Sequence, residues 1–284
     1  MKKTILITGA SRGIGAAIAR RLAVFDGSPS RLILNCNTDT EGLATVIDEI
    51  NRAVPDCQIV PMICDLSDAE ARSAAFARAV DASGGHTPHI LINNAGIADI
   101  GLLQDLSSDR LMAILSTNLA AALDLARLCI PGMIRRMHDM PDSDLSMPQT
   151  NDTTSSDSSI RVAFGSSTPA VPNCAILNIS SVWGQVGASC EVAYSAAKGG
   201  LNAMTRALAK ELAPSSIPVN AIACGLIDTQ MNRLLSPEEL ADVIDQIPAG
   251  RMATADEVAK TVELILSAPT YLTGQVIGFD GGWI

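Results

Sequence analysis

Short apolar segments alternate with longer Ala-rich segments along almost the whole chain, and no other feature of the sequence restricts the fold as strongly. The apolar segments are continuous runs, which is typical of strands that are buried on both faces. Buried strands separated by helices indicate a parallel sheet with helices on both sides. The sequence therefore predicts an α/β protein with a doubly wound parallel sheet of about seven strands. The candidate strands read TILITG, RLILNC, QIVPMICDL, HILINNAG, CAILNISS, IPVNAIAC and GQVIGFDGG.

One polar segment, HDMPDSDLSMPQTNDTTSSDSS at 138–159, interrupts this alternation. It is rich in Ser, Thr, Asp and Pro and has no hydrophobic period. A helix candidate ends before it and a strand candidate follows it, so the pattern resumes where it stopped. We therefore expect a single domain over 1–284 with a polar, acidic surface insertion at about 138–172. Residues 160–164, IRVAF, are a candidate short strand within that insertion.

The composition excludes several classes of protein. The chain has 284 residues, 48% of them hydrophobic, so it can bury a sizeable core and is not disordered as a whole. Its formal net charge of -10 argues against nucleic acid or an anionic membrane as the main partner. Neither a signal peptide nor a run of about 18 apolar residues is found, so we expect a cytoplasmic protein without a membrane span. The seven cysteines form no CxxC pair, which favours reduced, buried thiols, and no metal site is expected.

A glycine-rich turn, TGASRGIG at 8–15, follows the first candidate strand and opens a helix. Glycines allow the backbone to turn tightly and approach a pyrophosphate, which the free N–H groups of the helix terminus then bind. The spacing is G-x-x-x-G-x-G, and an ordinary structural turn is the alternative interpretation. Its place in an alternating pattern favours a dinucleotide-binding Rossmann fold. The loop residues expected to contact the cofactor are Gly9, Ser11, Arg12, Gly13, Ile14 and Gly15.

The end of the second strand favours NADP(H) over NAD(H), although NAD(H) remains possible. An acid at that strand end would bind the ribose 2′-hydroxyl of NAD. Here the position holds Asn37, and Asp39 comes later, in the following turn. Arg12 lies inside the glycine-rich loop, where its guanidinium could reach a 2′-phosphate. The alternative is that Arg12 is a solvated surface charge.

Three residues near the fifth strand form a candidate catalytic group. Tyr194 and Lys198, in YSAAK, are four apart and therefore lie on one face of a helix. A nearby ammonium is expected to lower the pKa of the phenol, so that it can exchange a proton with an alcohol or carbonyl oxygen. Ser181 ends a strand thirteen residues upstream, and its hydroxyl can hydrogen-bond the same substrate oxygen.

The order of these motifs resembles the short-chain dehydrogenase/reductase family. The matching segments cover nearly the whole chain outside 138–172 and read TGASRGIG, DL, NNAG, STNL, ISSVWG, YSAAK and TGQVIGFDGGW. The resemblance implies that Tyr194 is the general acid/base, that Ser181 orients and polarises the carbonyl, and that Lys198 lowers the Tyr194 pKa and holds the nicotinamide ribose. It implies that Asn118 keeps a water in a proton relay. It also implies cofactor contacts at Asp65, Leu66, Asn93, Ala95, Gly96, Ile227 and Thr229, with Asn37 beside them.

Within that family the motifs are most similar to those of 3-oxoacyl-[acyl-carrier-protein] reductases, enzymes of fatty acid biosynthesis. This implies NADPH-dependent reduction of a 3-oxoacyl thioester and a homotetramer or dimer. The acidic chain is poorly suited to an acidic carrier protein, so a dehydrogenase or reductase of a small alcohol, sugar, steroid or other ketone remains the alternative. A non-catalytic NADP-binding sensor or scaffold would lack a catalytic residue, and Ser181, Tyr194 and Lys198 are all present. One departure from the family is Cys224, which stands where a proline usually precedes Gly225.

Overall fold

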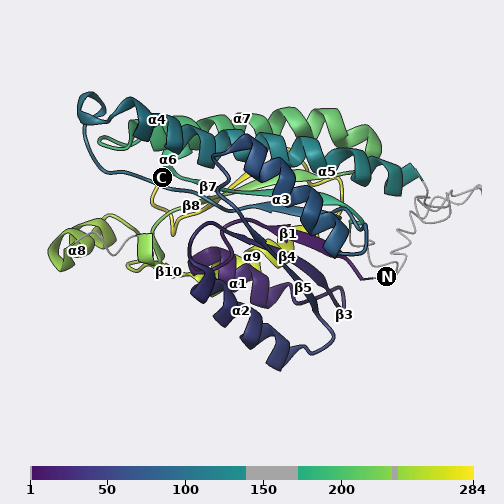
Figure 1. Cartoon of the computed structure of the whole chain (residues 1–284). Coiled ribbons are helices and arrows are strands. Elements are labelled where there is room, and N and C mark those ends of the chain that lie inside the picture. Colours follow the sequence, from purple (N-terminus) through teal and green to yellow (C-terminus); the bar gives the residue numbers. More distant parts are fainter. Residues whose placement is uncertain (1, 139–171, 232–235) are drawn as a thin grey trace, which may run out of the picture.

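The computed structural model describes residues 2–138, 172–231 and 236–284, and these build a seven-stranded sheet between two layers of helices (Figure 1). All neighbouring strands pair in parallel. This confirms the predicted doubly wound sheet. In spatial order the strands are β11 (Val276–Phe279), β8 (Val219–Cys224), β7 (Ala175–Ser181), β6 (Ile90–Asn93), β1 (Thr4–Ile7), β4 (Arg31–Cys36) and β5 (Gln58–Ile63).

The two helix layers follow from the two-residue period of the strands. Ile5 and Ile7 of β1 belong to one hydrophobic cluster, whereas Leu6 between them belongs to the other. The first cluster packs under α1 (Gly13–Arg21), α2 (Thr40–Ala53) and α9 (Ala255–Leu266). The second packs under α3 (Ala69–Ala82), α5 (Ala121–His138) and α7 (Val192–Leu212). Figure 1 shows these two groups of helices on opposite faces of the sheet.

The helix that follows the glycine-rich turn is shorter than the apolar sequence there, which continues to Phe25. It ends at Arg21, and a small antiparallel hairpin of β2 (Val24–Phe25) and β3 (Ser28–Pro29) follows. Asp26 and Gly27 connect the two strands, both with positive φ. An Asp-Gly pair favours this two-residue turn, so the hairpin has a local sequence signal.

The helix candidate that ends before the polar segment is interrupted by a turn of different geometry. A π-helical turn at Ser116–Ala120 separates α4 (Ser108–Leu115) from α5 and carries Asn118. Such turns insert an extra residue and often occur at functional sites. The combined stretch Ser108–His138 is long and apolar enough to cross a membrane, by length and composition alone. In this fold, however, α5 buries Leu125, Cys129 and Met133 against the sheet.

Residues 139–171, and with them nearly all of the expected acidic insertion and its candidate strand, lie outside the described residues. The described ends of that segment lie at the amino edge of the sheet. Pro172 shortly precedes β7, and its carbonyl accepts a hydrogen bond from Lys3, which precedes β1. At the end of α5, Arg136 donates to the carbonyls of Thr87 and Pro88, just before β6.

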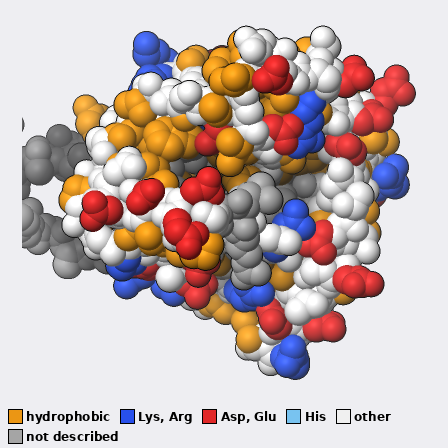
Figure 2. All heavy atoms as spheres, turned by 90° about the vertical axis from the view of Figure 1, so that its left-hand side faces the viewer, with side chains coloured by type: hydrophobic (Ala, Val, Ile, Leu, Met, Phe, Trp, Pro, Cys, Tyr) orange, Lys and Arg blue, Asp and Glu red, His pale blue; other side chains and the backbone are white. Residues whose placement is uncertain are grey.

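The opposite, carboxyl edge carries the remaining short elements. These include α6 (Trp183–Val186), directly after β7, and α8 (Pro237–Asp245). Strand β9 (Ile227–Asp228) pairs with β10 (Ala253–Thr254) beside them. Figure 2 looks onto this edge and shows hydrophobic side chains gathered over its upper part.

Candidate active site

The four predicted catalytic residues meet at the carboxyl edge of the sheet. Ser181 is the last residue of β7, and Tyr194 and Lys198 lie in the first two turns of α7. Asn118 arrives from the other side, on the π turn that packs against α7. The group thus combines residues from both sides of the undescribed segment 139–171.

Tyr194, Ser181 and Lys198 are in direct or near contact. The Tyr194 hydroxyl is hydrogen-bonded to the Ser181 side chain. The Ser181 Oγ also accepts a hydrogen bond of 3.2 Å from the Trp183 backbone N–H. The Lys198 Nζ lies 5.6 Å from the centroid of the Tyr194 ring and donates a hydrogen bond of 2.8 Å to the Ile179 carbonyl. The lysine is therefore fixed beneath the ring.

Burial dominates the electrostatics of this group. It raises the pKa of Tyr194 above its ordinary value, and the nearby Cys224 and Glu191 add to the effect, whereas the Ser181 hydrogen bond opposes it. Burial lowers the pKa of Lys198 to about 8. The expected lowering of the Tyr194 pKa by Lys198 is thus not seen in the chain alone, because desolvation of the phenolate outweighs the charge of an ammonium that points at a carbonyl. Tyr194 is a neutral proton donor in this state.

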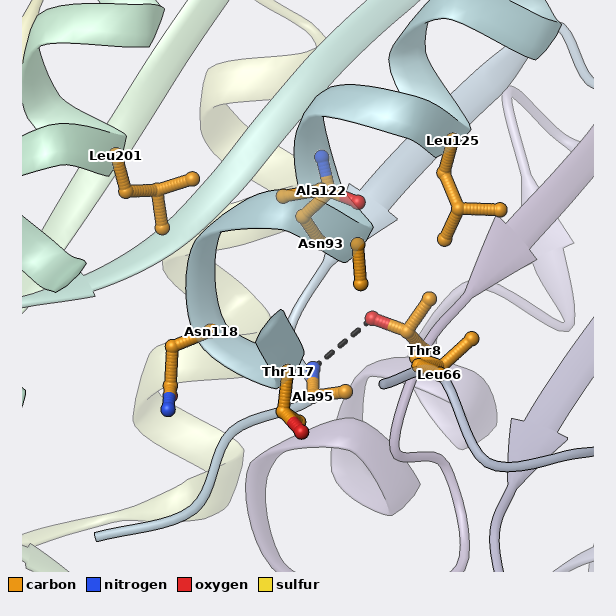
Figure 3. Close-up of a pocket in the computed structure, with 10 residues that line it drawn as sticks. Thr8, Leu66, Asn93, Ala95, Thr117, Asn118, Ala122, Leu125 and Leu201 are labelled. Atoms are coloured by element: carbon orange, nitrogen blue, oxygen red, sulfur yellow. Dashed lines mark hydrogen bonds between the residues drawn. The ribbon is translucent and has the colours of Figure 1, made fainter. Parts of the chain in front are cut away.

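Asn118 is buried next to a small internal cavity of about 10 Å³ (Figure 3). Its Nδ2 donates to the carbonyls of Ile97 and Ile114, both at 2.8 Å. Its Oδ1 has no hydrogen-bond partner among the described residues. A cavity of this size holds about one water molecule. A Cβ on Gly96 would come within 2.5 Å of the Asn118 Oδ1, so this close approach requires glycine.

A second polar network lies beneath Lys198 and has no motif in the sequence. The Ser180 Oγ donates to the Asn202 Oδ1 at 2.6 Å, and the Asn202 Nδ2 donates to the Gly184 carbonyl at 3.0 Å. A Cβ on Gly184 would lie 2.6 Å from the Lys198 carbonyl carbon. This network joins β7, α6 and α7, and it agrees with a structural role for Ser180.

The glycine-rich turn forms a tight cradle at the start of α1. Gly9 and Gly13 have positive φ, and a Cβ on Gly15 would lie 2.1 Å from the Gly9 carbonyl oxygen. The N-cap residue Arg12 makes no side-chain cap, so the first N–H groups of α1 are left for another acceptor. These features fit a bound pyrophosphate. Ser11 and Ile14 lie within the same turn.

Thr8 and Asn94 hold this cradle against β6, and neither was singled out from the sequence. The Thr8 Oγ1 accepts from the N–H groups of Asn94 and Ala95, each at 2.9 Å, and Figure 3 shows the Ala95 bond. The Asn94 Nδ2 donates to the carbonyls of Thr8 and Gly9. The NNAG sequence was the available signal, because its second asparagine directly follows the strand.

Arg12 is not free in the structure. It is exposed and lies 3.3 Å from Asp39, whose carboxylate also caps α2 through the Gly42 N–H. A hydrogen bond from Ser11, the Gly42 N–H and the charge of Arg12 together hold the pKa of Asp39 below its ordinary value. Asp39, which the sequence places in the turn after the second strand, thus lies next to the glycine-rich loop.

The remaining expected cofactor residues are distributed along the same edge. Asp65 accepts two hydrogen bonds from Ser67 and one from the Asn37 side chain, and Leu66 beside it is buried. Asn93 donates to Asn178 at 2.8 Å, and its Oδ1 is without a partner among the described residues. Thr229, two residues after the buried Ile227, lies opposite Gly13, where a Cβ would be 3.4 Å from the Thr229 Cγ2.

Cys224 ends β8 and is paired in register with Ser181. Its thiol is buried, which raises its pKa to about 12 despite the charge of Lys198. Burial and a high pKa make a reactive thiolate unfavourable at this position. Across the described ranges, no three His, Cys, Asp or Glu side chains are grouped as a metal site would require.

Comparisons with known proteins agree with this geometry. Residues 3–138 match the family model described as short chain dehydrogenase, and residues 142–284 match Enoyl-(Acyl carrier protein) reductase. The chain is 32% identical to the uncharacterized oxidoreductase YmfI of Bacillus subtilis, covering 100% of this chain and 99% of that protein. It is 31% identical to the 3-oxoacyl-[acyl-carrier-protein] reductase FabG of Pseudomonas aeruginosa, covering 99% and 96%.

Two solved structures of similar fold are also a dehydrogenase and a reductase by their descriptions. A putative gluconate dehydrogenase from Agrobacterium tumefaciens superposes with a TM-score of 0.79 at 30% identity, covering 99% of this chain and 95% of that one. YwfH, an NADPH dependent reductase involved in bacilysin biosynthesis, also has a TM-score of 0.79 at 21% identity, covering 100% and 99%, and supports the fold. From its fold, its site and these matches, the chain belongs to the short-chain dehydrogenase/reductase family of oxidoreductases.

Proposed function

We propose that this protein interconverts a carbonyl and an alcohol with NADP(H), and that its substrate is a 3-oxoacyl thioester. The observation that carries the reaction type is the neutral hydroxyl of the half-buried Tyr194, which is bonded to Ser181 beside a buried lysine of lowered pKa. The substrate class is supported by the full-length similarity to the FabG reductases of Pseudomonas aeruginosa and Escherichia coli.

In the reduction, the residues of the site supply the proton and the positioning. A nicotinamide cofactor, when bound along 9–15 and 93–96, supplies the hydride that forms the new C–H bond. Tyr194 donates its hydroxyl proton to the carbonyl oxygen, which becomes the alcohol. Ser181 donates a hydrogen bond to the same oxygen and polarises the carbonyl. Lys198 stabilises the resulting phenolate, and a water at the Asn118 Oδ1 supports its reprotonation.

For the cofactor, the geometry at Arg12 supports NADP(H). The ion pair with Asp39 is exposed, and pairs of this kind contribute at most about 1 kcal/mol. A 2′-phosphate carries more charge than one carboxylate and can replace Asp39 as the partner of the guanidinium. Arg12→Ala should therefore raise the KM for NADPH and leave that for NADH nearly unchanged. Equal effects on both cofactors would contradict this selection.

A second substrate class is favoured by the charge of the protein. The net charge of -10 opposes docking of an acidic carrier, and the half-buried Glu191 adds an acid beside Tyr194. A small polar ketone or alcohol avoids the docking penalty. Assays with acetoacetyl thioesters and small hydroxylated ketones, at equal NADPH, separate the two classes.

The compartment and the oligomeric state are proposed from the resemblance to the family. We propose a cytoplasmic dimer or tetramer. The free state of all seven cysteines fits a reducing compartment. Met112 and Leu123, on α4 and α5, are about half exposed and suit a subunit contact.

Tyr194→Phe tests the proposal, and the chain offers a matched control. The second tyrosine of the chain, Tyr271, is 98% exposed, so Tyr271→Phe removes a hydroxyl far from any buried site. We expect Tyr194→Phe to lower kcat roughly 10²- to 10⁴-fold while NADPH still binds, and Tyr271→Phe to leave turnover unchanged. Turnover by Tyr194→Phe within twofold of the unmodified protein would exclude the proposed mechanism.

A further inference from the structure

Three residues that the reaction does not use form one side of the site. Trp183 begins α6, two residues after Ser181, and its ring packs edge-on against Trp283 near the C-terminus, with centroids 4.9 Å apart. The Trp183 side chain hydrogen-bonds the carboxylate of Glu191, the N-cap residue of α7. We name Trp183, Glu191 and Trp283 the acidic wall.

Glu191 retains unused hydrogen-bonding capacity. A carboxylate offers about four acceptor positions, and within the described ranges Trp183 is its one side-chain donor. No Lys or Arg of the described part of the chain forms an ion pair with it. Its partial burial raises its pKa, so the site carries a desolvated acid that lacks a cation.

Two residues of the acidic wall lie close in sequence to the residues that hold the reacting oxygen: Glu191 to Tyr194, and Trp183 to Ser181. Glu191 precedes Tyr194 by one helical turn, and its charge contributes to the raised Tyr194 pKa. The backbone N–H of Trp183 donates to the Ser181 Oγ, so Trp183 lies beside the second residue proposed to contact the substrate oxygen. Glu191 thus lies near the Tyr194 hydroxyl and is bonded to the residue that contacts Ser181, so the acidic wall borders the place of the reacting oxygen.

The rest of this side is apolar. Val186 and Val192, next to the wall in sequence, are 61% and 45% exposed. Together with the two indoles they offer hydrophobic contact. Among the side chains of these two valines and the acidic wall, Glu191 is the one that can accept a hydrogen bond.

We propose that Glu191 is a specificity residue that accepts a hydrogen bond from a donor group on the carbon next to the reacting carbonyl. This inference rests on the proposed function and selects its second substrate class, the small polar ketone or alcohol, because a 3-oxoacyl thioester carries only CH2 groups next to its ketone carbon. Two groups share the required chemistry, a hydroxyl and an ammonium, and the acid binds the second also by charge. A plain alkyl substituent would leave the carboxylate desolvated and unpaired.

Three ketones of equal length separate these cases: butan-2-one, hydroxyacetone and aminoacetone carry methyl, hydroxyl and ammonium at one position. We expect kcat/KM with a donor group to exceed that with butan-2-one by roughly 10- to 100-fold. Glu191→Leu should remove both preferences. Glu191→Gln retains an acceptor oxygen without charge, so it should keep part of the hydroxyl preference and lose the ammonium preference.

Glu211→Gln is the matched control, because Glu211 is exposed and lies at the far end of the same helix. It changes the net charge equally and should leave all three ratios unaltered. Substrate ratios that stay the same in Glu191→Leu would overturn the proposal, as would a preference for butan-2-one in the unmodified protein.

Binding can be followed without turnover, because Trp183 and Trp283 are the only tryptophans. In Tyr194→Phe, hydroxyacetone should change the indole emission saturably, and Glu191→Leu added to that variant should weaken the midpoint roughly tenfold or more. Saturation that does not depend on Glu191 would refute the acidic wall. Failure of every ketone to turn over, with the Glu191-dependent emission change intact, would refute the proposed reaction and not the wall.

Discussion

Replacing Lys198 by Met should change the pH dependence of folding stability in a defined direction. Lys198 is 3% exposed, and its pKa in the folded chain is about 8, against an ordinary value of 10.5. The folded pKa lies below the unfolded one, so between about pH 8 and 10.5 the unfolded chain binds more protons. The buried lysine therefore lowers the free energy of unfolding by its full amount below pH 8. This loss of stability decreases as the pH rises toward 10.5.

The size of the effect follows from the two values. The gap between about 8 and 10.5 corresponds to roughly 3 kcal/mol in total, at about 1.4 kcal/mol per pKa unit. Between pH 7 and pH 9 the linkage relation gives a relief of roughly 1.3 kcal/mol. Methionine keeps the apolar stem and removes the charge, so any advantage of Lys198→Met over the unmodified protein should shrink by that amount.

Urea unfolding of both proteins without cofactor, followed by far-UV circular dichroism at pH 7 and pH 9, measures this change. Taking the difference between the two proteins cancels the titration of all other groups, including the cysteines. Lys210→Met removes an exposed lysine from the same helix and serves as the matched control. A pH-independent difference for Lys198→Met, or one that grows with pH, would refute the assignment of a desolvated lysine.

Three further outcomes follow from single contacts. Gly184→Ala places a Cβ 2.6 Å from the Lys198 carbonyl carbon, so it should cost roughly 1–3 kcal/mol in urea unfolding and lower kcat; an unchanged protein would show that α6 can yield. Arg72→Met removes the buried guanidinium that lies 2.9 Å from Asp124 and also donates to the Leu66 carbonyl; because Arg127 still pairs with Asp124, the loss should be about 1–3 kcal/mol by urea unfolding, and an unchanged free energy of unfolding would contradict a stabilising role for these bonds. A thiol reagent should label Cys190 rapidly in the native protein and the six buried cysteines only after unfolding, and a second fast thiol would contradict their burial.

The sequence predicts most of the fold because a strand that is buried on both faces needs consecutive apolar residues, which can be read directly in the sequence. β1 and β6 each contain three consecutive apolar residues, and the structure buries all the residues of both strands. The proximity of Tyr194 and Lys198 was likewise predictable, since the two residues share one helical face. The electrostatics of this pair was not, because the Tyr194 pKa depends on desolvation, which residue spacing does not report.

Other features arise from contacts between distant residues. Trp183 and Trp283 are a hundred positions apart, so no local pattern links them to each other or to Glu191. Arg12 and Asp39 come together because successive parallel strands bring their ends to one edge. The π turn around Asn118 follows from packing against α7, and helical periodicity alone does not predict it.

The places where residues 139–171 join the rest of the chain affect how the protein can vary. His138 ends α5 and Pro172 precedes β7, at the amino edge of the sheet. The six residues of β7 that precede Ser181 then span about 20 Å. A change of length at that edge leaves the hydroxyls of Ser181 and Tyr194 where they are, whereas one residue gained or lost between these two residues would separate the hydroxyls. The amino end of β7 can therefore accept segments of different length, whereas the carboxyl end fixes the positions of the reacting hydroxyls.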